Sequence, residues 1–159
     1  MKPIIYIDMD GVLADFGKAI KNHPQAKTNE FKDQPDNIPG IFEHLEPIEG
    51  AIEAVEKLND SGKYDLFILT TAPWDNPGAW MHKRLWIESH FAKIFYKKII
   101  ITHRKDLLIG DYLIDDRTAR GAAEFKGTHL HFGWDYVNDK LNNYPNWEAV
   151  LDYFKLNHQ

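Results

Sequence analysis

The sequence contains no cysteine, which excludes disulfide bonds and thiolate metal ligands. It also has no apolar run long enough to span a membrane. Basic residues are not in excess, because 19 Lys and Arg stand against 24 Asp and Glu, for a formal net charge of −5. Nucleic-acid polymers are usually bound by a basic face. We therefore expect neither a nucleic-acid polymer nor a membrane as a partner.

A signal-peptide pattern is lacking as well, since the opening residues MKPIIYIDMD are too acidic and their apolar run is too short. We therefore expect a cytoplasmic protein. The sequence has no internal repeat and no low-complexity tract. Its composition is that of a globular chain, with 43% hydrophobic and 27% charged residues. A length of 159 residues suits one domain with a sizeable core, which we place at 1–159.

Short apolar runs that are rich in Ile and bounded by turn residues predict buried strands. They are Ile4–Ile7, Tyr64–Leu69, Lys98–Ile101, Tyr112–Ile114 and Thr128–Phe132. Helical spacing predicts helices between them, at Ile48–Leu58, Trp80–Phe91, Thr118–Phe125 and Asn146–Phe154. In the second of these helices, Trp80, Arg84, Ile87 and Phe91 are predicted to lie along one stripe, with Leu85 beside it. This alternation predicts an α/β fold, a three-layer Rossmann-like parallel sheet covered on both faces.

Residues 16–45 interrupt the alternation. The segment contains Pro24, Pro35, Pro39 and Gly40, and it has few apolar residues. It is too long for an ordinary connection between a strand and a helix. We expect a helix followed by an irregular insertion, which would form a small cap over one end of the sheet.

Polar side chains follow four of the predicted strands. Asp8 and Asp10 follow the first, Thr70 and Thr71 the second, Lys105 the third, and Asp115 and Asp116 the fourth. In an open parallel sheet, ligands bind just beyond the carboxyl ends of the strands. We therefore expect these side chains to lie at one edge of the sheet.

The combination of these side chains indicates phosphoryl transfer. Several carboxylates in a small space call for a hard cation, and Mg²⁺ prefers oxygen ligands. A lysine and a hydroxyl suit the oxygens of a phosphate group. An aspartate can act as a nucleophile and carry the phosphoryl group as an aspartyl-phosphate.

The four motifs resemble those of a known superfamily. DMDGVLADF, LTTAP, the lysine of THRK, and LIDDR resemble, in order, the motifs of the haloacid dehalogenase superfamily over roughly Ile4 to Arg117. Together with FEHLEPIEGA, they look like the 5'(3')-deoxyribonucleotidases. The resemblance implies a haloacid dehalogenase fold with a cap insertion at 16–45. It also implies magnesium-dependent hydrolysis of deoxyribonucleoside monophosphates.

The resemblance also implies a role for each motif residue. Asp8 would be the nucleophile and a magnesium ligand, and Asp10 the general acid and base, binding the metal through its backbone carbonyl. Thr71 would hold a phosphoryl oxygen, and Lys105 would neutralise the phosphoryl group and orient Asp8. Asp115 or Asp116 would complete the metal site, with Asp115 favoured by the superfamily's usual rule.

A further set of residues is predicted to bind substrate: Met9, Phe42, Thr70, Ala72, Trp74 and Arg104. The backbone amide of Met9 would help to cradle the phosphate. Phe42 and Trp74 offer aromatic surfaces for a base. Ala72 stands where relatives often have serine, and Arg104 stands one place from an arginine of the family pattern.

Three alternatives stay open at this stage. One keeps the mechanism but changes the substrate to a sugar phosphate or another small phosphomonoester. Another is a receiver-like phospho-acceptor switch, which the motif order disfavours because receivers carry their acidic pair at the first strand. The third is an inactive member of the superfamily that serves as a binding protein. The sequence leaves open whether the protein is a monomer or a homodimer.

Overall fold

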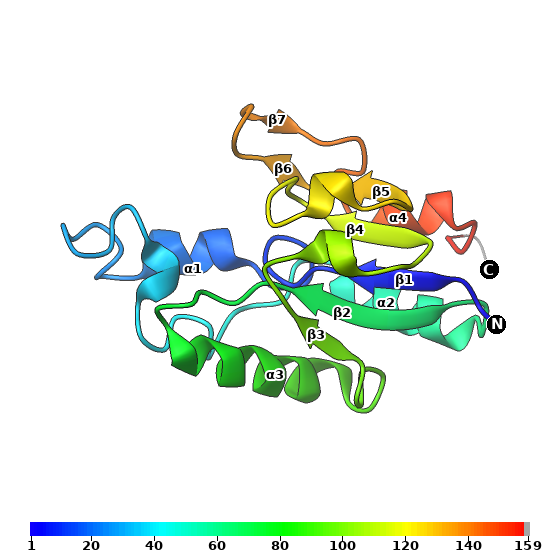
Figure 1. Ribbon diagram of the computed structural model, residues 1–159, viewed down its shortest axis with the longest axis horizontal. Helices are drawn as coiled ribbons and strands as arrows, with labels where there is room; N and C mark the ends of the chain where they lie inside the picture. Colours follow the sequence, from blue (N-terminus) through cyan, green and yellow to red (C-terminus); the bar gives the residue numbers. More distant parts are fainter. Residues whose placement is uncertain (158–159) are drawn as a thin grey trace.

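The computed structural model describes residues 1–157. Five parallel strands form the central sheet in the order β3-β2-β1-β4-β5 (Figure 1). They are β1 (Ile4–Ile7), β2 (Asp65–Thr70), β3 (Ile99–Ile101), β4 (Tyr112–Asp115) and β5 (Thr128–His131). All five predicted strands are present, with small shifts at their ends. The prediction of an α/β fold with a parallel sheet is confirmed.

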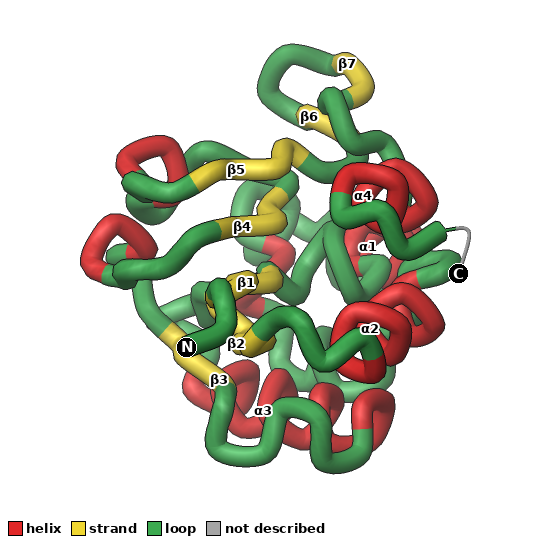
Figure 2. The backbone as a smooth tube through the Cα atoms, turned by 90° about the vertical axis from the view of Figure 1, so that its right-hand side faces the viewer, coloured by secondary structure: helices red, strands yellow, loops and turns green. Residues whose placement is uncertain are grey.

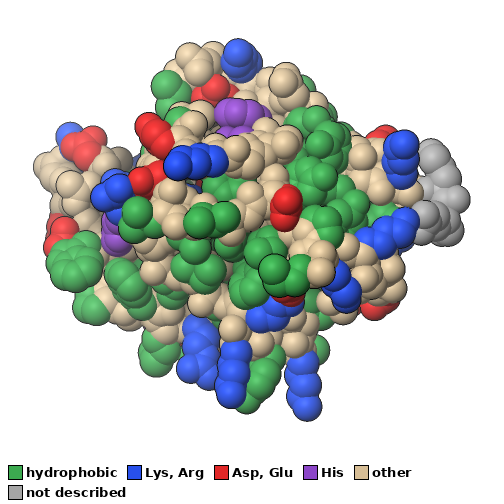
Figure 3. Space-filling view, turned by 45° about the vertical axis from the view of Figure 1, so that its right-hand side comes forward, with side chains coloured by type: hydrophobic (Ala, Val, Ile, Leu, Met, Phe, Trp, Pro, Cys, Tyr) green, Lys and Arg blue, Asp and Glu red, His purple; other side chains and the backbone are tan. Residues whose placement is uncertain are grey.

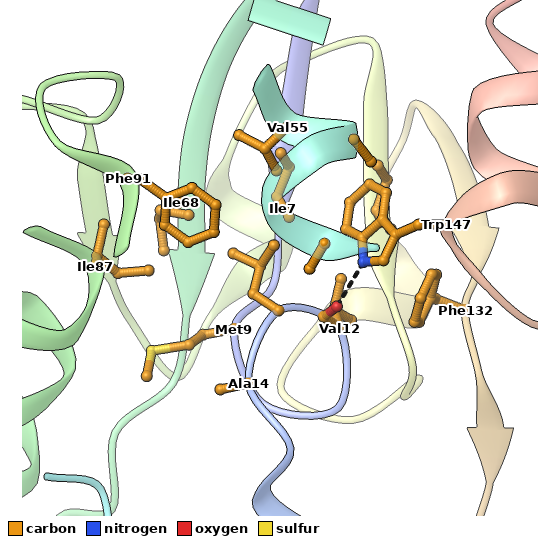
Figure 4. Close-up of a cluster of buried hydrophobic side chains, with 14 of the residues drawn as sticks. Ile7, Met9, Val12, Ala14, Val55, Ile68, Ile87, Phe91, Phe132 and Trp147 are labelled. Carbon is orange, nitrogen blue, oxygen red and sulfur yellow. Dashed lines mark hydrogen bonds between the residues drawn. The ribbon is translucent and has the colours of Figure 1, made fainter. Parts of the chain in front are cut away.

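One face of the sheet is covered by helices α2 (Ala51–Asp60), α3 (Pro77–Phe91) and α4 (Trp147–Tyr153). Figure 2 shows α2 and α4 together on one side of the strands. The strand side chains that face them include Ile7 and Ile68, which pack with Val55, Ile87 and Trp147 in the main core (Figure 4). These helices begin within three residues of the predicted starts.

The opposite face has a thinner cover than predicted. Tyr6, Leu69 and Leu113 pack there against Ala122 and Phe125. The cover consists of two 3₁₀ turns, η2 (Lys105–Leu107) and η3 (Ala122–Glu124).

The predicted helix Thr118–Phe125 is wrong, because the chain turns sharply before η3. Arg120 and Gly121 both have positive φ angles, 58° and 84°. The carbonyl of Arg120 accepts a hydrogen bond from the backbone N–H of Lys105, at 2.7 Å, and this bond joins the two turns.

The buried stripe of α3 also differs from the prediction. Its buried residues are Ala79, Lys83, Trp86, Ile87 and Phe91. Arg84 is instead exposed and pairs with Glu88, four residues further along the same helix. A lysine therefore occupies a buried position of this helix.

The segment 16–45 contains a short helix, α1 (Phe16–Asn22), and a 3₁₀ turn, η1 (Pro35–Asn37). It projects beyond the carboxyl ends of the strands, at the left of Figure 1. The buried side chain of Asn76 anchors it to the start of α3. Its amide donates to the carbonyls of Asp36 and Ile38, at 3.0 and 3.1 Å.

A two-stranded antiparallel hairpin, β6 (Trp134–Asp135) and β7 (Lys140–Leu141), follows β5 and was not predicted. On the face shown in Figure 3, side chains of both charge signs are interspersed with apolar ones, and several Lys and Arg side chains gather along its lower edge. Within residues 1–157, no helix has the length and apolar character needed to cross a bilayer.

Candidate active site

The first and fourth motifs meet at the point where the strand order reverses. The chain runs outward from β1 through β2 to β3 and then returns to β4 on the other side of β1. Asp8 directly follows β1 and Asp115 ends β4, and the backbone N–H of Asp8 donates to the carbonyl of Ile114 at 2.9 Å. In open α/β sheets this switch point forms the crevice that binds ligands.

The loop after β1 folds back on itself around Met9. The Met9 carbonyl accepts hydrogen bonds from the N–H groups of Leu13 and Ala14, at 2.8 and 2.9 Å. Gly11 has a φ of 77°, a conformation that residues with side chains rarely adopt. A Cβ at Gly11 would also overlap the carboxylate of Asp116. The glycine therefore allows both the turn and the close approach of the second acidic pair.

Lys105 links the two acidic motifs. Its Nζ lies 3.2 Å from Asp8 Oδ1 and 2.5 Å from Asp115 Oδ2, and all three side chains are buried. The pKa of the Lys105 ammonium is raised because the two carboxylates outweigh its burial. The pKa of Asp8 is lowered: burial opposes its ionisation, but the charges of Lys105 and Lys83 together prevail.

Asp8, Asp115 and Asp116 form a compact cluster of carboxylates. Each offers an oxygen that lies within 4.8 Å of those of the other two. Burial, reinforced by the charge of Asp8, raises the pKa of Asp115 to about 7 and that of Asp116 to about 9. Among residues 1–157, Asp116 Oδ1 is buried without a hydrogen-bond partner.

These observations fit a divalent cation. With all groups ionised, four carboxylates and two lysines would give the site a formal charge of −2; the groups are Asp8, Asp10, Asp115, Asp116, Lys83 and Lys105. A hard divalent cation would balance that charge, and it prefers carboxylate oxygens. Asp8, Asp115 and Asp116 could hold it.

Asp10 has a lysine partner that the sequence analysis did not identify. Lys83 Nζ lies 2.6 Å from Asp10 Oδ2, and it also donates to Thr70 Oγ1 and to the Thr71 carbonyl. Burial raises the pKa of Asp10, although Lys83 opposes the shift. The only sequence signal for this role is that residue 83 shares a helix face with Ala79 and Ile87, one turn away on either side.

A cavity of about 640 Å³ brings most of the predicted catalytic side chains together. Its lining includes Asp8, Asp10, Thr71, Lys105, Asp115 and Asp116, together with Phe42 and Trp74. This volume is typical of small-molecule sites. The Thr71 hydroxyl donates to the carbonyl of Thr102 at 2.7 Å, so its oxygen keeps acceptor capacity for a further partner.

The two predicted aromatic residues differ in their surroundings. Trp74 is 76% exposed and lies in edge contact with Trp80 and near His103, which also lines the cavity. Phe42 is 1% exposed, and its ring stacks on Phe16 at a centroid distance of 4.8 Å. Trp74 therefore offers far more free aromatic surface to a ligand than Phe42 does.

The other predicted substrate-binding residues lie outside the cavity lining. Met9, Thr70 and Ala72 are buried. Arg104 is exposed, and its guanidinium pairs with Asp106 at 2.7 and 2.9 Å. Arg117 and Arg120 line the cavity instead, and the signal for Arg117 was its place directly after the second acidic pair.

The same fold is found in solved hydrolases. A haloacid dehalogenase-like family hydrolase from Streptococcus pneumoniae matches 96% of this chain and 98% of its own, with a TM-score of 0.61 and 21% identity. The haloacid dehalogenase hydrolase YfnB from Bacillus subtilis, whose structure was solved bound to magnesium, matches 96% of this chain with a TM-score of 0.60 and 14% identity. The fold and the arrangement of acidic motifs define a haloacid dehalogenase-like hydrolase.

Sequence comparison gives the particular family. The model of the family described as 5' nucleotidase, deoxy (pyrimidine), cytosolic type C protein matches residues 33–155, and the chain belongs to this family. A protein of Vibrio phage KVP40 that bears the provisional name 5'(3')-deoxyribonucleotidase is 49% identical over 152 residues, covering 96% of this chain and 84% of its own. The human cytosolic-type 5'(3')-deoxyribonucleotidase is 32% identical over 148 residues, covering 76% and 74%. The predicted family is confirmed, and the protein is a phosphomonoester hydrolase. This excludes the receiver-like and inactive alternatives.

Proposed function

We propose that this protein is a magnesium-dependent 5'(3')-deoxyribonucleotidase that hydrolyses deoxyribonucleoside monophosphates through an aspartyl-phosphate on Asp8. The observation that carries the proposal is the cluster of Asp8, Asp115, Asp116 and Lys105 at the switch point of the sheet. The family name and those of the relatives supply the substrate class. The name of the family also supports a location in the cytosol.

Asp8 is the proposed nucleophile. Because two lysines keep its pKa low, its carboxylate stays ionised and can attack the phosphorus of the substrate. A new bond forms between phosphorus and an Asp8 oxygen, and the bond from phosphorus to the ester oxygen breaks. Asp10 gives a proton to the leaving alkoxide, so that the nucleoside departs as an alcohol.

The second step regenerates the enzyme. Asp10, now a carboxylate, takes a proton from a water molecule as that water attacks the phosphorus of the aspartyl-phosphate. The bond between phosphorus and Asp8 breaks, and inorganic phosphate leaves. Lys105 would offset the negative charge that Asp8 and the phosphoryl group bring together.

Asp8, Asp115 and Asp116 would hold the Mg²⁺ ion, with the backbone carbonyl of Asp10 as a further proposed ligand. The ion would supply positive charge that screens the repulsion between the attacking carboxylate and the phosphate group. Thr71, which lines the cavity, would contact a phosphoryl oxygen by turning its hydroxyl hydrogen from the Thr102 carbonyl to that oxygen. Arg117 and Arg120 offer two further cationic groups at the same cavity.

The segment 16–45 is proposed as a small cap on a single domain of residues 1–159. Residues from this segment, including Phe16, Pro35 and Phe42, line the cavity together with Trp74 and His103. A nucleobase would lie between the cap and the exposed ring of Trp74.

The test is release of inorganic phosphate from a panel of deoxyribonucleotides, ribonucleotides and sugar phosphates, each with magnesium and with a chelator. We expect magnesium-dependent release that favours deoxyribonucleoside monophosphates such as dUMP and dTMP. Preferential release from sugar phosphates would contradict the proposed substrate and keep the mechanism. Equal release with magnesium and with chelator would contradict the proposed metal.

A further inference from the structure

Lys83 belongs to none of the four motifs, yet it is as deeply buried as Asp115, with 1% exposure. Its ammonium group donates to Asp10 Oδ2 at 2.6 Å, Thr70 Oγ1 at 3.0 Å and the Thr71 carbonyl at 2.8 Å. A lysine has three N–H donors, so all of them are used. Burying a charge is costly unless it is paired and hydrogen-bonded, and this arrangement meets both conditions.

The two oxygens of Asp10 consequently have different surroundings. Oδ2 is bound to Lys83, whereas Oδ1 is buried and has no hydrogen-bond partner within the described residues. The Asp10 side chain lines the cavity that also contains Asp8 and Lys105. Oδ1 is thus the carboxylate oxygen whose hydrogen-bonding capacity the described residues leave unused.

Lys83 also fixes Asp10 relative to a different strand. Asp10 lies on the loop after β1, whereas two of the three Lys83 acceptors, Thr70 and Thr71, lie at the end of β2. The lysine itself comes from α3, and its ammonium lies 4.8 Å from the ring centre of Phe42 in the cap segment. The orientation of the Asp10 carboxylate therefore depends on β2 and α3 as well as on the loop that carries Asp10.

We propose that Lys83 is a positioning residue that holds Oδ2 of Asp10 and so directs Oδ1 toward the leaving oxygen of the substrate. This inference rests on the proposed function, in which Asp10 transfers a proton. In the first step, the proton on Oδ1 moves to the ester oxygen as the bond between that oxygen and phosphorus breaks. In the second step, Oδ1 takes a proton from the attacking water.

The leaving group distinguishes positioning from a merely structural role. The alkoxide of a nucleotide needs a proton to depart, whereas p-nitrophenolate departs without one. In Lys83→Met, we expect release of nucleoside from a deoxyribonucleoside monophosphate in a single turnover to slow by on the order of 10²-fold. The first burst of p-nitrophenolate from p-nitrophenyl phosphate should stay close to the wild-type rate.

Arg84→Met is the matched control. Arg84 lies next to Lys83 on α3, is exposed and pairs only with Glu88 among the described contacts, so both rates should be unchanged. Thr70→Val is a second variant for the case that Lys83→Met does not fold. It removes one acceptor of the lysine but keeps both charges, and it should slow the nucleotide reaction several-fold more than the aryl reaction.

A double substitution provides a readout that does not depend on the aryl substrate. If Lys83 acts through Asp10, adding Lys83→Met to Asp10→Asn should cause no further loss of kcat. Equal slowing of both leaving groups, or a further loss in the double variant, would overturn the inference. Wild-type protein that releases no phosphate from any substrate with magnesium would contradict the proposed function instead, so the two failures are distinct.

Discussion

Asp8 has a lowered pKa, and its carboxylate lies beside the Lys105 ammonium. A carboxylate nucleophile needs both properties. Replacing it with the isosteric Asn removes the charge and keeps the shape. We expect Asp8→Asn to lower magnesium-dependent phosphate release by at least about 10³-fold, with an unchanged circular dichroism spectrum. Asp60→Asn, at an exposed position of α2, should keep full activity. Substantial turnover by a folded Asp8→Asn protein would exclude Asp8 as the nucleophile.

A comparison of Gly11 with Gly62 distinguishes two reasons for a glycine: a positive φ angle and a lack of space for a Cβ. Both have positive φ angles, 77° and 67°, so alanine at either position is strained. Only at Gly11 would a Cβ meet a neighbour, Asp116; at Gly62 nothing lies within 4 Å. We expect Gly62→Ala to cost about 1 kcal/mol of unfolding free energy with full activity. Gly11→Ala should cost more and also lose phosphatase activity.

Urea unfolding and phosphate release would measure both effects on the same preparations. A Gly11→Ala protein as stable and as active as Gly62→Ala would mean that the loop and Asp116 can move apart without consequence.

At the scale of the elements, one side-chain amide joins the proposed cap segment, residues 16–45, to the start of α3. Asn76 is buried and donates to two carbonyls of residues 36–38. Because Asn76→Ala leaves both carbonyls without this donor, it should loosen the cap. We expect KM for a deoxyribonucleotide to rise by up to roughly tenfold, the equivalent of about 1.4 kcal/mol. The KM of p-nitrophenyl phosphate, which has no sugar or nucleobase, should change little.

Asn157→Ala is the control for this prediction. Its amide also donates to a carbonyl, that of Glu148, but on the helix α4. Its kinetic constants should match the wild type. An equal rise in KM for both substrates of Asn76→Ala would show that the cap segment supports the site without contributing to substrate choice.

The strands and the polar residues at their ends were predictable because each strand carries a local signal. Ile-rich runs of four to six residues end directly in Asp8, Thr71 or Asp115, and parallel pairing brings such ends to one edge. Lys83 was not predictable in this way. A lysine on a helix is usually solvated, and its burial depends on Asp10, Thr70 and Thr71, which are distant in sequence or on another element.

The helix predicted at residues 118–125 was wrong for a related reason. Its sequence has helical spacing, but the tertiary bond from Lys105 to the Arg120 carbonyl and the positive φ of Gly121 favour a turn. That turn also helps to place Lys105 at the site. A tertiary contact at the site therefore outweighs the local preference of the segment.

At the scale of the whole molecule, the crowded carboxylates make stability depend on pH and metal. In an unfolded chain an aspartate titrates near 3.9. In the folded protein without metal, the pKa of Asp115 is raised to about 7 and that of Asp116 to about 9. Ionising them therefore opposes folding, and this contribution should lower stability as pH rises from about 4 toward 9.

Magnesium should offset this loss, because it binds the ionised carboxylates of the folded state. We expect the stabilisation by magnesium, measured by urea unfolding with magnesium and with chelator, to be larger at pH 8 than at pH 5. At 100 times its dissociation constant, a ligand of the folded state adds about 2.7 kcal/mol. An equal effect at both pH values would place the ion away from these carboxylates.

The hydrogen bond from Trp147 to the carbonyl of Val12, at 2.8 Å, joins the last helix to the first loop (Figure 4). The loop that carries Asp8 and Asp10 is synthesised well before α4. Until Trp147 arrives, the Val12 carbonyl has no indole donor, and the apolar residues around it lack their cover. Folding of the catalytic loop must therefore await synthesis of α4, and a nascent chain that stalls before residue 147 should have no phosphatase activity.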